Sequence, residues 1–121
     1  MKIIAGEYKG RLFKMPKGIR PTQDVHRKAI FDILKDVVQG AKFLDMYAGS
    51  GAVGLEALSR GAGEVVFVES REECIKVLRE NLRGIAEKKK GAKTLQQNIR
   101  VLAHDAFSAV YREHVHDGSV L

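Results

Sequence analysis

Three closely spaced glycines are the residues best suited to bind a ligand. Gly49, Gly51 and Gly54 follow an apolar run and fit the G-x-G-x-x-G pattern of nucleotide-binding turns. Glycines after a strand let a ligand approach the backbone, and the next helix offers unpaired N–H groups and the positive end of its dipole. Glu69 ends the next apolar run, about 20 residues further on, where an acid can accept hydrogen bonds from ribose hydroxyls. The pattern therefore predicts a ligand with an adenosine-type ribose.

Two further acids help to choose between candidate ligands. Asp45 precedes the glycine turn, where its charge would repel the pyrophosphate of NAD and attract the ammonium of S-adenosylmethionine. Asp105 follows a third apolar run, at the end of a strand that would face the ligand crevice. There it could accept a hydrogen bond from an adenine amino group, or cap the helix that begins near Ala106. The acids favour S-adenosylmethionine and leave NAD as the alternative.

Alternating strands and helices must position these residues. The pattern predicts strands over 42–47, 65–68 and 99–103, followed by helices over 52–60, 70–88 and 106–113. The apolar run of the second strand is continuous, as in a strand that is buried on both faces. This order predicts an α/β fold with a parallel, doubly wound sheet.

The first forty residues predict a different local structure. Residues 2–5 and 11–15 are short apolar runs joined by a segment with two glycines, which predicts a β-hairpin. Thr22 has the side chain of a helix N-cap, and Gly40 would close that helix. The helix carries an apolar stripe at helical spacing, formed by Val25, Ala29, Ile30, Ile33, Leu34 and Val37.

The net positive charge of the chain comes from its N-terminal part. The net charge is +6, and residues 1–42 hold ten Lys and Arg against four acids, whereas the remainder is balanced. A one-sided excess of this kind favours a polyanionic partner such as nucleic acid. A solvated face is the simpler alternative.

Composition argues against several other classes of protein. No stretch approaches the roughly 20 apolar residues that span a bilayer, so we expect no membrane segment. The single cysteine, Cys74, excludes an internal disulfide framework and favours the cytoplasm. The four histidines show no ligand pattern with cysteines or acids, so no metal site is predicted.

Several motifs together resemble one protein family. The run from Phe43 to Gly51 resembles motif I of class I methyltransferases. Its continuation from Gly54 to Ala62 is similar to proteins of the RsmD family, and so are the start from Ile3 to Arg11 and the segment from Arg20 to Phe31. The resemblance covers essentially the whole chain.

The resemblance implies a Rossmann-like methyltransferase that uses S-adenosylmethionine to methylate the exocyclic amine of a guanine in small-subunit ribosomal RNA. The partner would be ribosomal RNA or the small ribosomal subunit. Residues 1–40 would form an RNA-facing hairpin and helix, and residues 41–121 the cofactor-binding half of the methyltransferase domain. The implied cofactor residues are Asp45, Tyr47, Ala48, Gly49, Ser50, Gly51, Glu69, Ser70, Asp105 and Ala106. The implied RNA-binding residues are Lys9, Arg11, Lys14, Arg20, Thr22 and Arg27.

One motif of the family is missing. The family carries an acid or amide, two prolines and an aromatic residue after its fourth strand, and these hold the target amine. Here Pro16 and Pro21 are the only prolines. We therefore expect the C-terminal half of the domain to be absent, leave the catalytic residues unassigned and expect the chain alone to be inactive. An inactive RNA-binding remnant, a DNA amino-methyltransferase and an NAD-binding protein stay open as alternatives.

Overall fold

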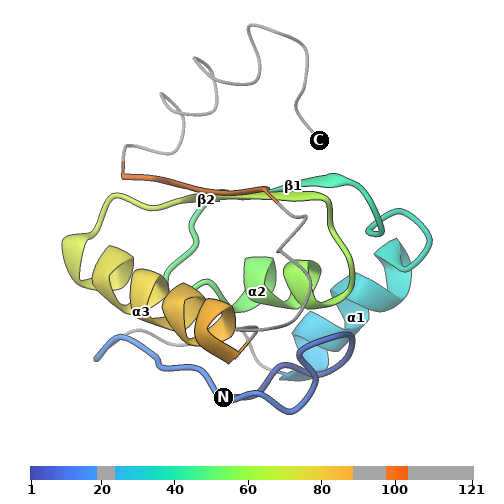
Figure 1. Ribbon diagram of the computed structural model, residues 1–121, viewed down its shortest axis with the longest axis horizontal. Helices are drawn as coiled ribbons and strands as arrows, with labels where there is room; N and C mark the ends of the chain where they lie inside the picture. The colour runs from blue at the N-terminus through green and yellow to red at the C-terminus, as the bar shows by residue number, and fades with distance from the viewer. Residues whose placement is uncertain (19–23, 89–97, 104–121) are drawn as a thin grey trace, which may run out of the picture.

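The structure, a computed structural model, describes residues 1–18, 24–88 and 98–103 as an α/β layer (Figure 1). Its elements are α1 (Asp24–Leu34), β1 (Lys42–Asp45), α2 (Ala52–Ser59), β2 (Glu64–Val68), α3 (Glu72–Lys88) and β3 (Asn98–Leu102). The strands are parallel and lie in the order β1-β2-β3. Figure 1 shows all three helices on one face of this sheet. The arrangement is that of one half of a doubly wound sheet, as the sequence predicts.

β2 lies at the centre of both the sheet and the core. Residues 65–68 are all completely buried. Val65 and Phe67 belong to a cluster shared with helix residues, whereas Val66 and Val68 belong to a second cluster. This alternation confirms the prediction of a strand that is buried on both faces.

The predicted N-terminal hairpin is short: its two runs share one antiparallel bridge, between Lys2 and Leu12, and the N–H groups of Ile3 and Phe13 donate to the carbonyls of Arg11 and Met1. Beyond this bridge the first run is bonded to α2. The buried carboxylate of Glu56 accepts the backbone N–H groups of Ile4 and Ala5 at 2.8 and 3.0 Å. Glu56 therefore holds the first run of the hairpin against α2 and pairs backbone donors that would otherwise be buried without a partner.

The same segment is fixed against the C-terminal end of α2. Ser59 Oγ accepts the N–H of Tyr8 at 2.9 Å and donates to the carbonyl oxygen of Ala5 at 2.6 Å. The Ser59 carbonyl accepts the N–H of Glu7 at 2.8 Å. Gly6 has a φ of +90°, and a Cβ there would lie 2.0 Å from the Ser59 carbonyl oxygen, so only glycine fits. The segment is part of the fold and not an appendage to it.

α1 turns a different side to the core from the one its apolar stripe predicts. Val25, Ile33 and Val37 are 64%, 80% and 59% exposed. Arg27 and Phe31 are completely buried instead. Of the stripe, Leu34 packs against the core. The N-terminal segment packs over the side of the helix that carries Arg27, whose guanidinium binds the backbone of Lys2.

α1 also ends earlier than predicted. The helix stops at Leu34, whose carbonyl accepts the N–H groups of Val37 and Val38 at 2.8 and 3.1 Å. This turn buries Val38 in the core. Gly40 has a φ of +77° and donates its N–H to the carbonyl of Gly61 at 2.8 Å, which leads the chain into β1. Early termination is therefore coupled to burial of Val38.

The remaining predicted elements agree with the structure to within two residues at each end. The predicted helix over 106–113 lies outside the described residues. In the part of the chain that is described, no helix has the length and apolar character needed to cross a bilayer. Within the same part, no three His, Cys, Asp or Glu side chains lie close enough to share a metal ion.

Candidate functional site

The glycine turn between β1 and α2 is tight and partly open. Gly49 and Gly51 have φ values of +57° and +89°, where glycine is favoured. The Gly51 N–H donates to the Ala48 carbonyl at 2.7 Å and closes the turn. A Cβ on Gly51 would lie 2.4 Å from Leu78 Cδ1, whereas one on Gly49 would meet nothing within 4 Å. Gly51 therefore allows Leu78 to pack closely against the turn, and Gly49 leaves space beside its backbone for a ligand.

Two carboxylates hold this turn from the ends of neighbouring strands. Glu69 follows β2, is 8% exposed, and accepts the N–H groups of Gly49 and Arg71, both at 2.9 Å. Asp45 ends β1 and accepts the N–H of Gly54, in the first turn of α2, at 3.0 Å. Because β1 and β2 are parallel neighbours, their carboxyl ends meet at one edge of the sheet, and both acids lie at this edge. The site is therefore acidic and joined to the helix N-terminus.

The environment of Asp45 favours a cationic ligand. Burial raises the pKa of this carboxyl from 3.8 to about 6; the charge of Glu69 adds to the increase, and the Gly54 N–H opposes it. A carboxylate with a raised pKa gains stability from a nearby positive charge. The ammonium of S-adenosylmethionine fits this requirement, and a pyrophosphate does not.

The other predicted cofactor residues differ in exposure. Ala48 and Ser50 are buried within the turn, whereas Tyr47 is 82% exposed and Ser70 is exposed as well. Two predicted residues lie outside the described part of the chain, namely Asp105 and Ala106. The proposed contact of Asp105 with adenine stays a prediction.

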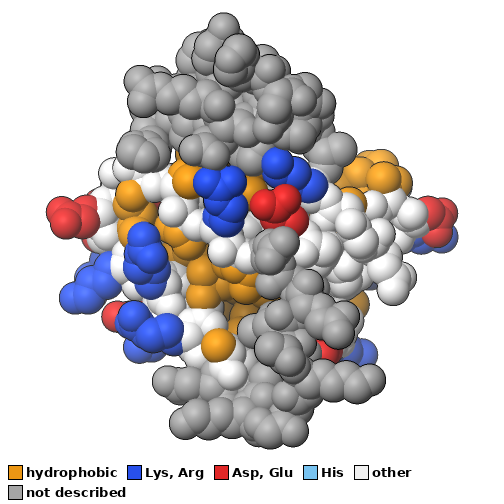
Figure 2. Space-filling view, turned by 45° about the horizontal axis from the view of Figure 1, so that its top comes forward, with side chains coloured by type: hydrophobic (Ala, Val, Ile, Leu, Met, Phe, Trp, Pro, Cys, Tyr) orange, Lys and Arg blue, Asp and Glu red, His pale blue; other side chains and the backbone are white. Residues whose placement is uncertain are grey.

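The predicted RNA-binding residues have different surroundings. Lys9 and Lys14 are exposed, and Lys14 Nζ lies 3.2 Å from a Glu80 carboxylate oxygen. Arg11 is half-buried and donates to the Gly84 carbonyl. Two further predicted residues lie outside the described residues, Arg20 and Thr22. Figure 2 shows Lys and Arg side chains beside an apolar strip on one face of the molecule.

Arg27 is not at the surface, so the prediction that it contacts RNA was wrong. Its side chain is completely buried. Nη2 donates to the carbonyl of Lys2 at 2.8 Å and to Asp24 Oδ1 at 2.6 Å, and the guanidinium lies 5.4 Å from the centre of the Phe13 ring. Arg27 therefore joins α1 to the N-terminal segment.

Sequence reasoning missed two buried polar residues, of which Asn81 contacts the glycine turn. Glu56 is completely buried and Asn81 is 7% exposed. A signal was present for Asn81, because it occupies a helical stripe that otherwise holds buried apolar residues such as Leu78 and Ile85. A polar residue in such a stripe needs hydrogen-bond partners from another segment.

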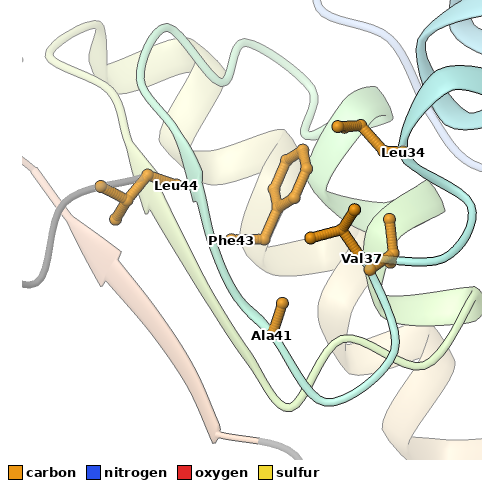
Figure 3. A pocket seen from close by; sticks show the side chains of 6 residues that line it. Leu34, Val37, Ala41, Phe43 and Leu44 are labelled. Atoms are coloured by element: carbon orange, nitrogen blue, oxygen red, sulfur yellow. The ribbon is translucent and has the colours of Figure 1, made fainter.

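A separate apolar pocket of about 290 Å³ lies between the end of α1 and β1 (Figure 3). Its lining residues are Leu34, Val37, Val38, Ala41, Phe43 and Leu44. Figure 3 shows the Phe43 ring on the side of Leu34 and Val37, with Leu44 pointing away from them across the strand. All of these side chains are apolar, so the pocket suits apolar groups and not a charged cofactor.

Comparison with known proteins identifies the family. The family model described as "Conserved hypothetical protein 95" matches residues 1–116. "Putative rRNA methyltransferase YlbH" of Bacillus subtilis is 35% identical over 113 residues, which are 92% of this chain and 57% of that protein. "Ribosomal RNA small subunit methyltransferase D" of Escherichia coli K12 is 42% identical over 84 residues, 68% of this chain and 42% of that protein. The chain belongs to this family, the RsmD family, and spans about half the length of these relatives.

Solved structures show the same fold. A hypothetical protein of Thermus thermophilus has a TM-score of 0.76 at 34% identity, and the match covers 97% of this chain and 63% of that one. "Putative methyltransferase yhhF" of Escherichia coli has a TM-score of 0.74 at 35% identity, with 91% of this chain and 55% of that one covered. The described residues therefore have the α/β fold of Rossmann-like methyltransferases, as predicted.

Proposed function

We propose that this chain binds S-adenosylmethionine and belongs to an enzyme that methylates a guanine amine in small-subunit ribosomal RNA. The observation that carries the proposal is the pair of carboxylates, Asp45 and Glu69, on either side of the open backbone at Gly49. The names of the relatives support the reaction class and the RNA substrate.

Each residue of the site has a defined part in this proposal. Asp45 holds the ammonium of the methionine end, since it is half-buried and its carboxylate lies near the charge of Glu69. Glu69 accepts hydrogen bonds from the ribose hydroxyls, because each of its oxygens keeps a second lone pair beyond its backbone partner. Gly49 allows the ligand to approach the turn. When bound, the cofactor supplies a methyl group that its sulfonium activates.

The RNA substrate is proposed to contact the N-terminal segment. Lys9 and Lys14 are exposed there and can neutralise phosphates. The target guanine must leave any helical stack for its amine to reach the cofactor, and orientation of that amine supplies much of the catalysis. A ribosomal RNA substrate supports the proposal that the protein acts in the cytoplasm.

Calorimetry with S-adenosylmethionine, S-adenosylhomocysteine and NAD tests the proposal. We expect the first two ligands to bind and NAD to bind more weakly, because its pyrophosphate would meet two carboxylates. Equal or tighter binding of NAD would contradict the proposal. Retention of labelled small-subunit RNA on a filter tests the RNA part separately, with a DNA duplex of equal length as competitor. Equal competition by that duplex would count against a preference for RNA.

A further inference from the structure

Asn81 connects the glycine turn to the cationic N-terminal segment through one buried amide. Its Nδ2 donates to the carbonyls of Ser50 and Lys14, both at 3.0 Å. Its Oδ1 accepts the Lys14 N–H at 2.8 Å. The side chain thus pairs with both backbone groups of Lys14, as a neighbouring strand would, and uses its remaining donor on the turn.

The bond to Ser50 fixes the shape of the turn. The peptide group between Ser50 and Gly51 is planar, so a carbonyl held toward Asn81 directs the Gly51 N–H the opposite way. That N–H closes the turn on the Ala48 carbonyl at 2.7 Å. The backbone at Gly49 then has its open side available to a ligand. Asn81 therefore supports the conformation that the cofactor would need.

The bonds to Lys14 fix the N-terminal segment. The Lys14 side chain is 74% exposed, while its backbone is held by the buried amide. Apart from Asn81, α3 holds this segment through the Glu80 carboxylate near Lys14 Nζ and the Gly84 carbonyl that accepts from Arg11. A shift of the segment would therefore break bonds of the same amide that holds the turn.

We propose that Asn81 is a positioning residue that couples cofactor binding to RNA binding. Its hydrogen bonds go to the backbone of Ser50 and Lys14, so it would act through these residues. A cofactor that orders the turn keeps the amide in place and so keeps the Lys14 backbone in the position for RNA, and the effect is reciprocal by thermodynamic linkage. This inference rests on the proposed function, since it needs both ligands to bind.

The test measures the affinity for S-adenosylhomocysteine by calorimetry, with and without a saturating transcript of small-subunit ribosomal RNA. In the unaltered protein we expect RNA to tighten this affinity about fivefold or more. Asn81→Leu and Asn81→Asp should reduce the ratio to near one, since the first removes all three bonds and the second removes both donors. The matched control is Glu80→Gln, which removes the neighbouring ion pair and should keep the ratio.

A purely structural role predicts a different result. If Asn81 only stabilises the fold, both variants lower the melting temperature and leave the ratio unchanged, which would overturn the inference. A ratio of one in the unaltered protein would overturn it as well. If S-adenosylhomocysteine or RNA does not bind by itself, the proposed function is contradicted. This outcome can be told apart from a failure of the coupling, in which both ligands bind.

A second measurement needs no variant and covers the case in which both variants fail to fold. Amide hydrogen exchange reports the stability of the Lys14 N–H, which Asn81 accepts. Adding S-adenosylhomocysteine to the unaltered protein should slow exchange at Lys14, although this residue does not belong to the turn. Exchange at Lys14 that is insensitive to the ligand would overturn the coupling.

Discussion

Asp45 and Glu69 hold opposite ends of one glycine turn. Glu69 accepts the N–H of Gly49 at 2.9 Å, and Asp45 accepts the N–H of Gly54 at 3.0 Å. The two acids reach the turn from adjacent parallel strands. The negative charges of the two carboxylates therefore repel each other. The turn is therefore hydrogen-bonded to both acids but electrostatically unfavourable without a ligand, and a bound cation would relieve this repulsion.

We expect Asp45→Asn to weaken binding of S-adenosylmethionine by about 1–3 kcal/mol. The amide can still accept the Gly54 N–H but has no charge for an ammonium. In the unaltered protein the affinity should fall as the pH is lowered through about 6, because Asp45 becomes protonated. Calorimetry across this range checks both effects, with exposed Asp32→Asn as the control. An Asp45→Asn variant with the pH dependence of the unaltered protein would show that another group binds the ammonium.

The same carboxyl should make the stability of the ligand-free protein depend on pH. The pKa of Asp45 is raised from 3.8 to about 6 on folding, so the folded chain binds this proton more tightly than the unfolded chain. Stability from this group is therefore complete below the lower value and is lost as the pH rises to about 6. The loss is at most about 3 kcal/mol, since one pKa unit corresponds to about 1.4 kcal/mol. Urea unfolding measures the free energy of unfolding at each pH. For Asp45→Asn, this free energy should lack the part of the pH dependence that comes from Asp45.

The glycine turn and its strands could be predicted from the sequence because their signals are local. Gly49 and Gly51 stand directly after an apolar run, and the turn they form depends on their own backbone freedom. Glu69 could be placed because parallel strands end at a common edge. Predicting the positions of these residues requires no knowledge of contacts between distant parts of the sequence.

The parts that could not be predicted depend on partners that are far away in the sequence. Arg27 looked like a surface cation, but the backbone of Lys2 and the ring of Phe13 surround its guanidinium. Val25 and Ile33 looked like core residues of α1, yet the helix turns its other side inward. Helical spacing shows that a stripe exists, and only tertiary packing decides which side is buried.

Gly49→Ala should reduce cofactor affinity more than its effect on stability would suggest. A Cβ at Gly49 meets no protein atom within 4 Å, so it would project into the space proposed for the ligand. Gly10→Ala is a matched control, because Gly10 also has a positive φ, of +83°, and open space around it. Each variant should lose about 1 kcal/mol of unfolding free energy through backbone strain. Only Gly49→Ala should lose affinity for S-adenosylhomocysteine in calorimetry; equal losses would place the ligand elsewhere.

Glu56→Gln should destabilise the fold by about 3 kcal/mol, because it leaves a buried network incompletely paired. The Glu56 carboxylate accepts two backbone N–H groups and the Nε–H of Arg60, and a glutamine amide would turn a donor toward one of them. Urea denaturation measures the change in unfolding free energy. Asp32→Asn breaks an exposed ion pair with Lys28 and should cost less than about 1 kcal/mol. A Glu56 variant as stable as this control would mean that the charge of Glu56 is not needed to hold the N-terminal segment against α2.

The exposed lysines of the N-terminal segment should set part of the salt dependence of RNA binding. Lys9 and Lys14 are exposed, and each phosphate contact that is lost should lower the log–log salt slope by about 0.7–0.9. The double variant Lys9→Ala with Lys14→Ala should therefore bind small-subunit RNA more weakly at low salt and retain its affinity for S-adenosylhomocysteine. Removal of two other cations, with Lys89→Ala and Lys90→Ala, controls for net charge alone. Filter binding over a range of salt concentrations gives both slopes. If the two double variants lose slope equally, the N-terminal lysines act only through net charge, and RNA has no preferred contact with this segment.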